Sequence, residues 1–153
     1  MAIQNTTALK QKTSRQYHNL VDSRNHFGGL TEVLTAAKTL TKDDSGKVFF
    51  VDSAAGAYEI TLPTSLEAGL YYKFIVQEDT PTGDVTIAAG SVIIHGTAKD
   101  AGGDVGVGTA STGVSNVILD TTAAKGDHAE LHCDGTSWYL NAQSSINNGI
   151  QTS

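Results

Sequence analysis

Short segments in which apolar and polar residues alternate, each closed by turn-forming residues, constrain the fold of this chain more than any other feature. In residues 70–77, the side chains of Tyr72, Phe74 and Val76 occupy every second position. Successive side chains of a β-strand point to opposite faces, so this spacing predicts a strand with one buried face. Residues 58–62 repeat the pattern and end at Pro63, which cannot donate a hydrogen bond to a neighbouring strand.

Six further segments have the composition of strands, and turn residues separate most of them at intervals of about 8 to 15 residues. They are residues 48–51, 85–88, 92–95, 114–119, 129–133 and 137–142. The Asp-Gly-Thr turn at 134–136 predicts that the last two form an antiparallel hairpin. Its buried face is expected to hold Leu131, Cys133, Trp138 and Leu140. Strands do not alternate with helical segments, which argues against a parallel α/β fold. We therefore expect an all-β fold, a small β-sandwich or barrel-like domain with an extended N-terminal arm.

Charge and composition divide the chain into three regions. Residues 1–29 are predicted to be an N-terminal arm for attachment, residues 30–143 a β domain, and residues 144–153 a flexible C-terminal tail. The first 30 residues carry four Lys and Arg against one Asp, a net charge of +3, whereas the remaining 123 carry six Lys against fifteen Asp and Glu, a net charge of -9. A basic leader on an acidic body is suited to an acidic partner surface. Within the body, the Gly-rich residues 96–113 are predicted to be an exposed loop.

Length and composition also exclude several classes of protein. A chain of 153 residues can bury a core of its own without disulfides or a structural metal. Cys133 is the sole cysteine, so we expect no disulfide framework and a reducing compartment. The N-terminal residues lack the apolar run of a signal peptide, and no segment reaches the roughly 18 apolar residues of a membrane span, so no membrane partner is expected. Four dispersed basic residues are too few to predict nucleic-acid binding.

The sharpest candidate for chemistry is the sequence His128-x-Glu130-x-His132, because residues two apart on a strand share a face and could converge on a metal ion. Along one strand, however, the two histidines stand roughly 13 Å apart, too far for one ion to contact both rings. A solvent-facing strand surface explains the same pattern, and His95 is interpreted as a strand-end residue.

Other motifs are equally unspecific. The glycines of residues 102–108 lack the following helix and the Gly-Lys-Ser/Thr ending of a phosphate-binding loop. No Gly-x-Ser-x-Gly motif is present, and Cys133 is predicted to be buried. Tyr71 and Tyr139 are candidates for an outer surface, where subunit packing or ligand stacking would use them. We expect no catalytic, cofactor-binding or metal-binding residue, and hence no enzyme.

Four segments carry a resemblance to a known class of proteins: residues 40–52, 58–63, 68–76 and 133–139. Over about residues 34–142, the chain resembles a module common in tailed-phage structural proteins, which include capsid decoration (cement) proteins, head fibres and tail-fibre segments. The resemblance implies a β-rich, often trimeric protein on the virion, made in the host cytoplasm. A decoration protein, which binds the major capsid protein and stabilises the head by bridging its subunits, fits this short chain best.

The arm is the expected capsid-binding element, with apolar residues that contact the capsid and basic residues that meet its carboxylates. The candidate contact residues are Leu9, Lys10, Lys12, Arg15, Tyr17, Leu20, Arg24 and Phe27, together with Ile3. Two alternatives belong to other classes of protein. One is a carbohydrate- or receptor-binding module of a head or tail fibre, which would use the loop at 96–113 and the outer-face tyrosines. The other is a polysaccharide-degrading enzyme, with carboxylates brought together from distant strands.

Overall fold

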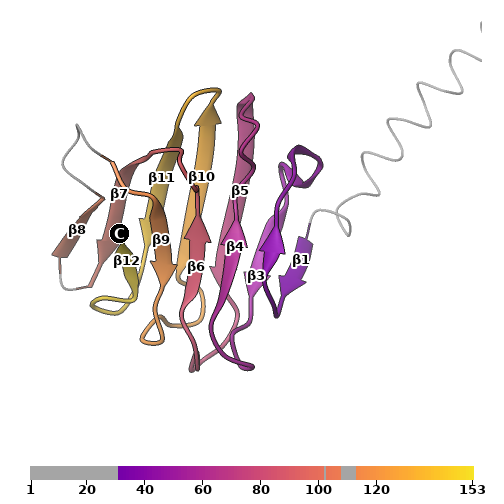
Figure 1. Ribbon diagram of the computed structural model, residues 1–153. Coiled ribbons are helices and arrows are strands. Elements are labelled where there is room, and N and C mark those ends of the chain that lie inside the picture. Colours follow the sequence, from indigo (N-terminus) through magenta and orange to yellow (C-terminus); the bar gives the residue numbers. More distant parts are fainter. Residues whose placement is uncertain (1–30, 102, 108–112) are drawn as a thin grey trace, which may run out of the picture. The chain divides into compact units, whose positions relative to one another are not determined.

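The computed structural model describes residues 31–101, 103–107 and 113–153 (Figure 1). The chain divides into two units, residues 1–31 and residues 32–153. The predicted arm at 1–29, with all its candidate capsid contacts, lies outside the described residues. The account below therefore concerns the second unit.

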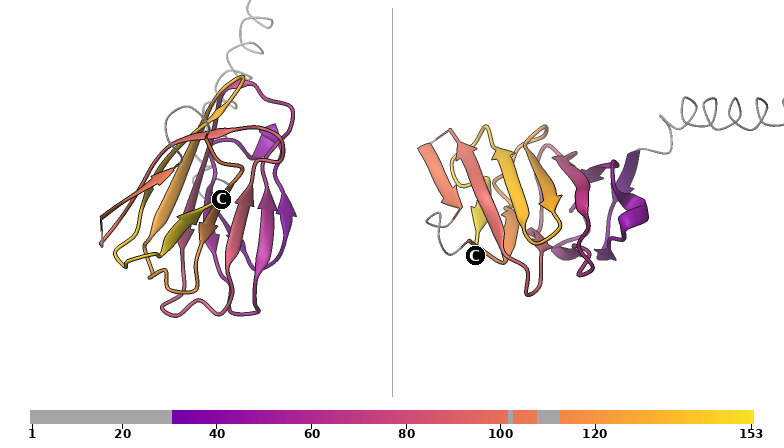
Figure 2. Two further views of the ribbon diagram at one scale, coloured as in Figure 1. Left: turned by 60° about the vertical axis from the view of Figure 1, so that its left-hand side comes forward. Right: turned by 90° about the horizontal axis from the view of Figure 1, so that it is seen from above.

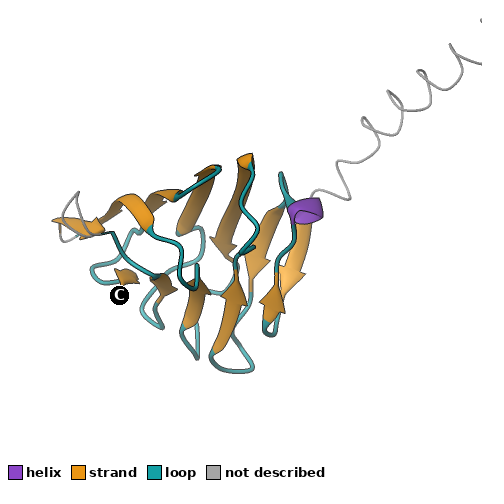
Figure 3. Cartoon of the chain, turned by 45° about the horizontal axis from the view of Figure 1, so that its top comes forward, coloured by secondary structure: helices purple, strands orange, loops and turns teal. Residues whose placement is uncertain are grey.

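The described residues form an all-β sandwich of two mixed sheets, which confirms the predicted fold class (Figure 3). The large sheet has seven strands in the order β1-β3-β5-β10-β11-β7-β8, and the small sheet has five in the order β12-β9-β6-β4-β2. The strands are β1 (Thr31–Leu34), β2 (Lys38–Thr39), β3 (Val48–Val51), β4 (Tyr58–Thr61), β5 (Ala68–Val76), β6 (Val85–Ala88), β7 (Ile94–Asp100), β8 (Gly103–Val107), β9 (Asn116–Leu119), β10 (His128–Asp134), β11 (Trp138–Gln143) and β12 (Ile150–Thr152).

The chain crosses from one sheet to the other with each successive strand from β1 to β7 (Figure 2). Strands of successive crossings pair in parallel, β2 with β4, β3 with β5, and β4 with β6. The β10–β11 hairpin then lies between β5 and β7, antiparallel to β5 and parallel to β7. Strands β1 to β7 therefore alternate between the two sheets, and the later β10–β11 hairpin is inserted between β5 and β7. In this order, strands far apart in the sequence become neighbours.

The space between the sheets is filled by the alternating apolar residues that the sequence identifies. Tyr72, Phe74 and Trp138 are fully buried, and the rings of Tyr72 and Trp138 lie 5.6 Å apart. Leu131 and Leu140 are paired across the predicted hairpin and buried on its inner face, which confirms that prediction. Burial of such side chains from both sheets in one cluster is the main force holding the sandwich together.

The prediction of an exposed loop at 96–113 is wrong for the part of this segment that forms strands. Residues 94–100 form β7 and residues 103–107 form β8, an antiparallel pair at the edge of the large sheet. The strand predicted at 92–95 accordingly starts two residues later and runs further. Glycine-rich residues have low intrinsic β-propensity, but pairing β7 with β11 and β8 satisfies their backbone groups and overrides it.

The prediction of a flexible tail at 144–153 is also wrong. Ile150 is fully buried, and β12 pairs with β9 in the small sheet. Ser144 is buried as well, and its hydroxyl donates a 2.6 Å hydrogen bond to Asp127. The polar composition of this segment misled the prediction, because its polar side chains bind Asp127 while one apolar residue completes the core.

A charged network holds the turn between β2 and β3, where a short 3-10 helix, η2 (Lys42–Asp44), lies. Asp44 is buried and accepts hydrogen bonds from the backbone and hydroxyl of Thr41, each 3.0 Å long. Its other oxygen lies 2.6 Å from the ammonium of Lys47 and 3.6 Å from that of Lys38. Burial alone would raise the pKa of Asp44, but the bonds from Lys47 and Thr41 and the charge of Lys38 outweigh burial and lower it to about 2.

We expect Asp44→Asn to remove part of the acid sensitivity of this domain. A carboxyl group whose pKa is lowered by folding stabilises the folded state above its unfolded pKa, near 3.8, and loses that contribution as the pH falls through about 2. The free energy of unfolding of the parent protein should therefore fall by about 2 kcal/mol more than that of Asp44→Asn on acidification over this range. Urea unfolding at a series of pH values measures the difference. The exposed neighbour Asp43→Asn is the control and should follow the parent protein; equal pH profiles for all three would contradict the prediction.

Candidate functional site

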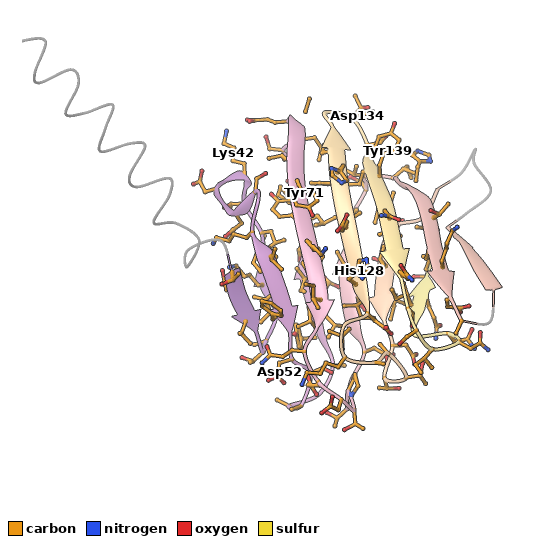
Figure 4. All side chains as sticks on the ribbon, turned by 180° about the vertical axis from the view of Figure 1, so that it is seen from behind. Lys42, Asp52, Tyr71, His128, Asp134 and Tyr139 are labelled. Atoms are coloured by element: carbon orange, nitrogen blue, oxygen red, sulfur yellow. The ribbon has the colours of Figure 1, made fainter. Side chains whose placement is uncertain are left out.

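The outer face of the large sheet gathers most of the side chains that the sequence singled out for chemistry (Figure 4). Along β10, Ala129, Leu131 and Cys133 are buried, so the alternate residues His128, Glu130 and His132 point outward. This arrangement agrees with the interpretation of a solvent-facing strand surface. Figure 4 shows Tyr71 and Tyr139 on the same face, nearer than His128 to the end where Asp134 lies.

Four rings form a row across this face, one from each of the strands β5, β10, β11 and β7. The strand registers pair Tyr71 with His132, His132 with Tyr139, and Tyr139 with His95. The rings of Tyr71 and His132 lie 4.6 Å apart, and those of Tyr139 and His95 lie 6.1 Å apart. We call Tyr71, His132, Tyr139 and His95 the aromatic row. It contains the two tyrosines that were predicted to lie on the outer face. It also contains two histidines, for which the sequence predicted no shared role.

A row of polar residues lies directly beside the aromatic row. The registers place Lys73, Glu130, Asn141 and Thr97 side by side across the same four strands. Lys73 and Glu130 form a 2.7 Å ion pair, whose hydrogen bond lowers the pKa of Glu130 and raises that of Lys73. The carboxylate of Glu130 is thus already engaged, which weighs against a role as a metal ligand between His128 and His132.

Asp134, at the end of β10, orients the exposed ring of Tyr139. One of its oxygens accepts hydrogen bonds from the backbone of Thr136 and Ser137, and the other accepts one of 3.0 Å from the hydroxyl of Tyr139. These bonds hold the pKa of Asp134 well below its usual range. The hairpin turn and the Tyr139 ring are therefore fixed by one carboxylate, although Tyr139 remains 45% exposed.

A second cluster lies at the opposite end of β10, around the buried carboxylate of Asp127. It accepts hydrogen bonds from the hydroxyls of Ser144 and Ser145 and from the backbone of Ala124 and Ser145. Burial would raise the pKa of Asp127, but these bonds outweigh burial and lower it. Ser144 is only 3% exposed and donates to Asp127, so this serine ties the C-terminal segment to the domain and is inaccessible as a nucleophile.

Pockets open on the described surface beside two of these elements. One, of about 290 Å³, adjoins the Asp127 cluster and includes His128 and Gln143. The other, of about 280 Å³, lies beside β2 and is lined mainly by threonines and by Leu40, Leu62 and Pro63. Within residues 31–101 and 113–153, no group of three or more His, Cys, Asp or Glu side chains is arranged to hold a metal ion.

The remaining sequence candidates are placed as follows. The nine capsid-binding candidates of the arm, Ile3 among them, lie outside the described residues. Cys133 is buried on the inner face of β10, as predicted. Residues 103–107 of the Gly-rich segment belong to β8, so this part of the segment is an edge strand.

No protein-family model matches the sequence, and no curated protein matches it with significant similarity. In the part of the chain that the structure describes, no helix is long and apolar enough to cross a membrane.

Proposed function

We propose that this protein is a non-catalytic structural component of a phage particle, a capsid decoration protein that binds the outer surface of the head. In this proposal it acts as a homotrimer, and it stabilises the particle by bridging subunits of the major capsid protein. The observation that carries the proposal is the contrast between a basic leader of net charge +3 and an acidic β-sandwich of net charge -9. The resemblance of residues 40–52, 58–63, 68–76 and 133–139 to the phage structural module supports it.

The chemistry of the described surface supports a binding role. Several carboxylates of the described domain are engaged in structural bonds, among them Asp44, Asp127 and Glu130. The core formed by the described residues begins at Leu34, so removing the leader leaves these buried residues in place. Contacts repeated in each copy of a trimer would add through effective concentration, so modest individual contacts suffice for firm attachment.

We expect deletion of residues 1–28 to abolish capsid binding. The deletion removes all the candidate contacts of the arm and leaves β1, which begins at Thr31, intact. Co-sedimentation of purified protein with phage heads assembled without it measures binding, and circular dichroism with thermal unfolding checks that the truncated protein remains folded. Undiminished binding by a folded truncated protein would refute the role of the arm. Failure of the full-length protein to bind the heads would refute decoration itself.

A charge variant separates the two kinds of arm contact. Replacing Lys10, Lys12, Arg15 and Arg24 with Ser should weaken capsid binding. The binding that remains should also depend less on salt concentration, because salt ions screen the attraction between surface charges. The matched control replaces four of the six lysines of the body, Lys42, Lys73, Lys99 and Lys125, with Ser and should leave binding unchanged.

A further inference from the structure

We propose that the aromatic row on the outer face of the large sheet is a binding site for a neutral oligosaccharide. This site shares no residue with the arm to which capsid attachment is assigned, because it lies entirely on the described domain. It uses Tyr71, His132, Tyr139 and His95 as a stacking platform and the adjacent polar row as hydrogen-bonding partners.

The dimensions of the row suit an extended chain of sugars. Neighbouring strands lie about 4.8 Å apart, so the four residues span about 14 Å from β5 to β7. A pyranose ring has an apolar C–H face and a rim of hydroxyl groups. Aromatic side chains with polar edges match both features, because their faces take the C–H groups and their hydroxyl or imidazole groups remain at the rim.

The platform is held in place before any ligand binds. The hydroxyl of Tyr139 is bound by Asp134, and the ring of Tyr71 rests against that of His132 at 4.6 Å. All four residues lie on paired strands in the middle of the sheet, where the backbone is fixed on both sides. Side chains ordered in this way lose little conformational freedom on binding, which favours affinity for a weakly interacting ligand.

The polar row supplies the hydrogen bonds that sugar hydroxyls require. Asn141 and Thr97 can each donate and accept, whereas Lys73 and Glu130 neutralise each other at 2.7 Å. Across β5, β10, β11 and β7 the outward-facing charges are Lys73 and Lys99 against Glu130 and Asp134, a net charge of zero with histidines neutral. The domain as a whole carries -9, so this face is a neutral area on an acidic body and is complementary to an uncharged ligand.

A second copy of the chain fits this face less well. Interfaces between identical subunits have an apolar centre. The large apolar side chains exposed in the described residues are Val33, Ile93, Tyr139 and Ile146, and only Tyr139 lies on the four strands of the platform. Apart from the partly exposed Ile75 of β5, the side chains that flank the aromatic row on these four strands are polar, which favours the oligosaccharide.

The test is a microbial glycan array probed with the full-length protein, followed by calorimetric titration with the neutral oligosaccharide that binds best.

Tyr139→Ala and Tyr71→Ala should each weaken binding about tenfold or more, because each removes a stacking ring. Tyr139→Phe retains the ring and loses the bond to Asp134, so it should retain most of the affinity. Val33→Ala, an exposed apolar change on the edge strand β1, is the matched control and should bind as the parent does. In two-dimensional NMR, the amide shifts caused by the ligand should be confined to β5, β10, β11 and β7.

Several outcomes would overturn the proposal. One is that no glycan on the array binds, and another is that binding is unchanged in a folded Tyr71→Ala/Tyr139→Ala double variant. Binding restricted to acidic glycans and abolished by salt would contradict the neutral class. A change in oligomeric state on Tyr139→Ala, without glycan binding, would assign the face to a second copy. Because capsid co-sedimentation is measured separately, none of these results bears on decoration.

Discussion

Replacing Trp138 with alanine is expected to lower the free energy of unfolding by about 3–5 kcal/mol, a large part of the stability of a domain of this size. Trp138 is fully buried at the start of β11, and its ring lies 5.6 Å from that of Tyr72. Removing the indole leaves a cavity between the two sheets that neighbouring strands cannot close without losing their pairing. Urea unfolding followed by far-ultraviolet circular dichroism measures the loss, because the variant has no tryptophan for fluorescence.

Trp138→Phe should cost much less than the alanine change. Among the described residues, Trp138 Nε1 is the buried side-chain polar atom without a hydrogen-bond partner, so phenylalanine keeps an aromatic ring and removes an unpaired donor. Tyr139→Ala, at the adjacent outward position, is the control for loss of an aromatic residue at the surface and should change stability by about 0.5 kcal/mol. A loss below about 1 kcal/mol for Trp138→Ala would contradict the account of the core.

Gly96→Ala is expected to have an effect of similar size for a different reason. Gly96 lies in β7 opposite Leu140 of β11, with a φ of +131° that side-chain-bearing residues rarely adopt. A Cβ atom there would lie 2.1 Å from the carbonyl oxygen of Leu140. The backbone conformation costs about 1–3 kcal/mol and the steric overlap about 1–3 kcal/mol, so the total loss should be about 2–6 kcal/mol. Thermal and urea unfolding measure it.

Gly90→Ala separates the cost of the backbone conformation from the cost of the steric overlap. Gly90 also has a positive φ, +65°, but a Cβ atom there would meet no other atom within 4 Å. Its replacement should therefore cost only the backbone strain, about 1–2 kcal/mol. If the two alanine variants are equally stable, the parallel β7–β11 strands do not approach as closely as described.

Much of the fold follows from local sequence patterns. The strands predicted at 48–51 and 85–88 coincide with β3 and β6, and the final hairpin has its predicted partners and buried face. These predictions succeed because alternation and turn chemistry are local properties, which the chain carries wherever the strand is placed. Predictions from composition failed at β8 and β12, where pairing with a neighbouring strand and one buried apolar residue outweigh a polar or Gly-rich sequence.

The candidate site could be predicted only in part. Alternation along β5 and β11 predicts that Tyr71 and Tyr139 point outward, and along β10 that His132 does. That these residues align, and that His95 joins them, depends on the registers of three separate strand pairs. The parallel pair of β7 and β11 joins segments more than forty residues apart, with no turn between them to set the register.

The order of apolar, polar and turn residues, by itself, determined that this chain forms short strands, which side of each strand is buried, and where its charges fall. Only the tertiary structure decided which strands are neighbours, that β7 and β8 extend the large sheet, and that β12 completes the small one. The physical reason is that strands pair through backbone groups that every residue shares. The choice of partner is therefore made by the packing of the whole core and not by the identity of the residues along one strand.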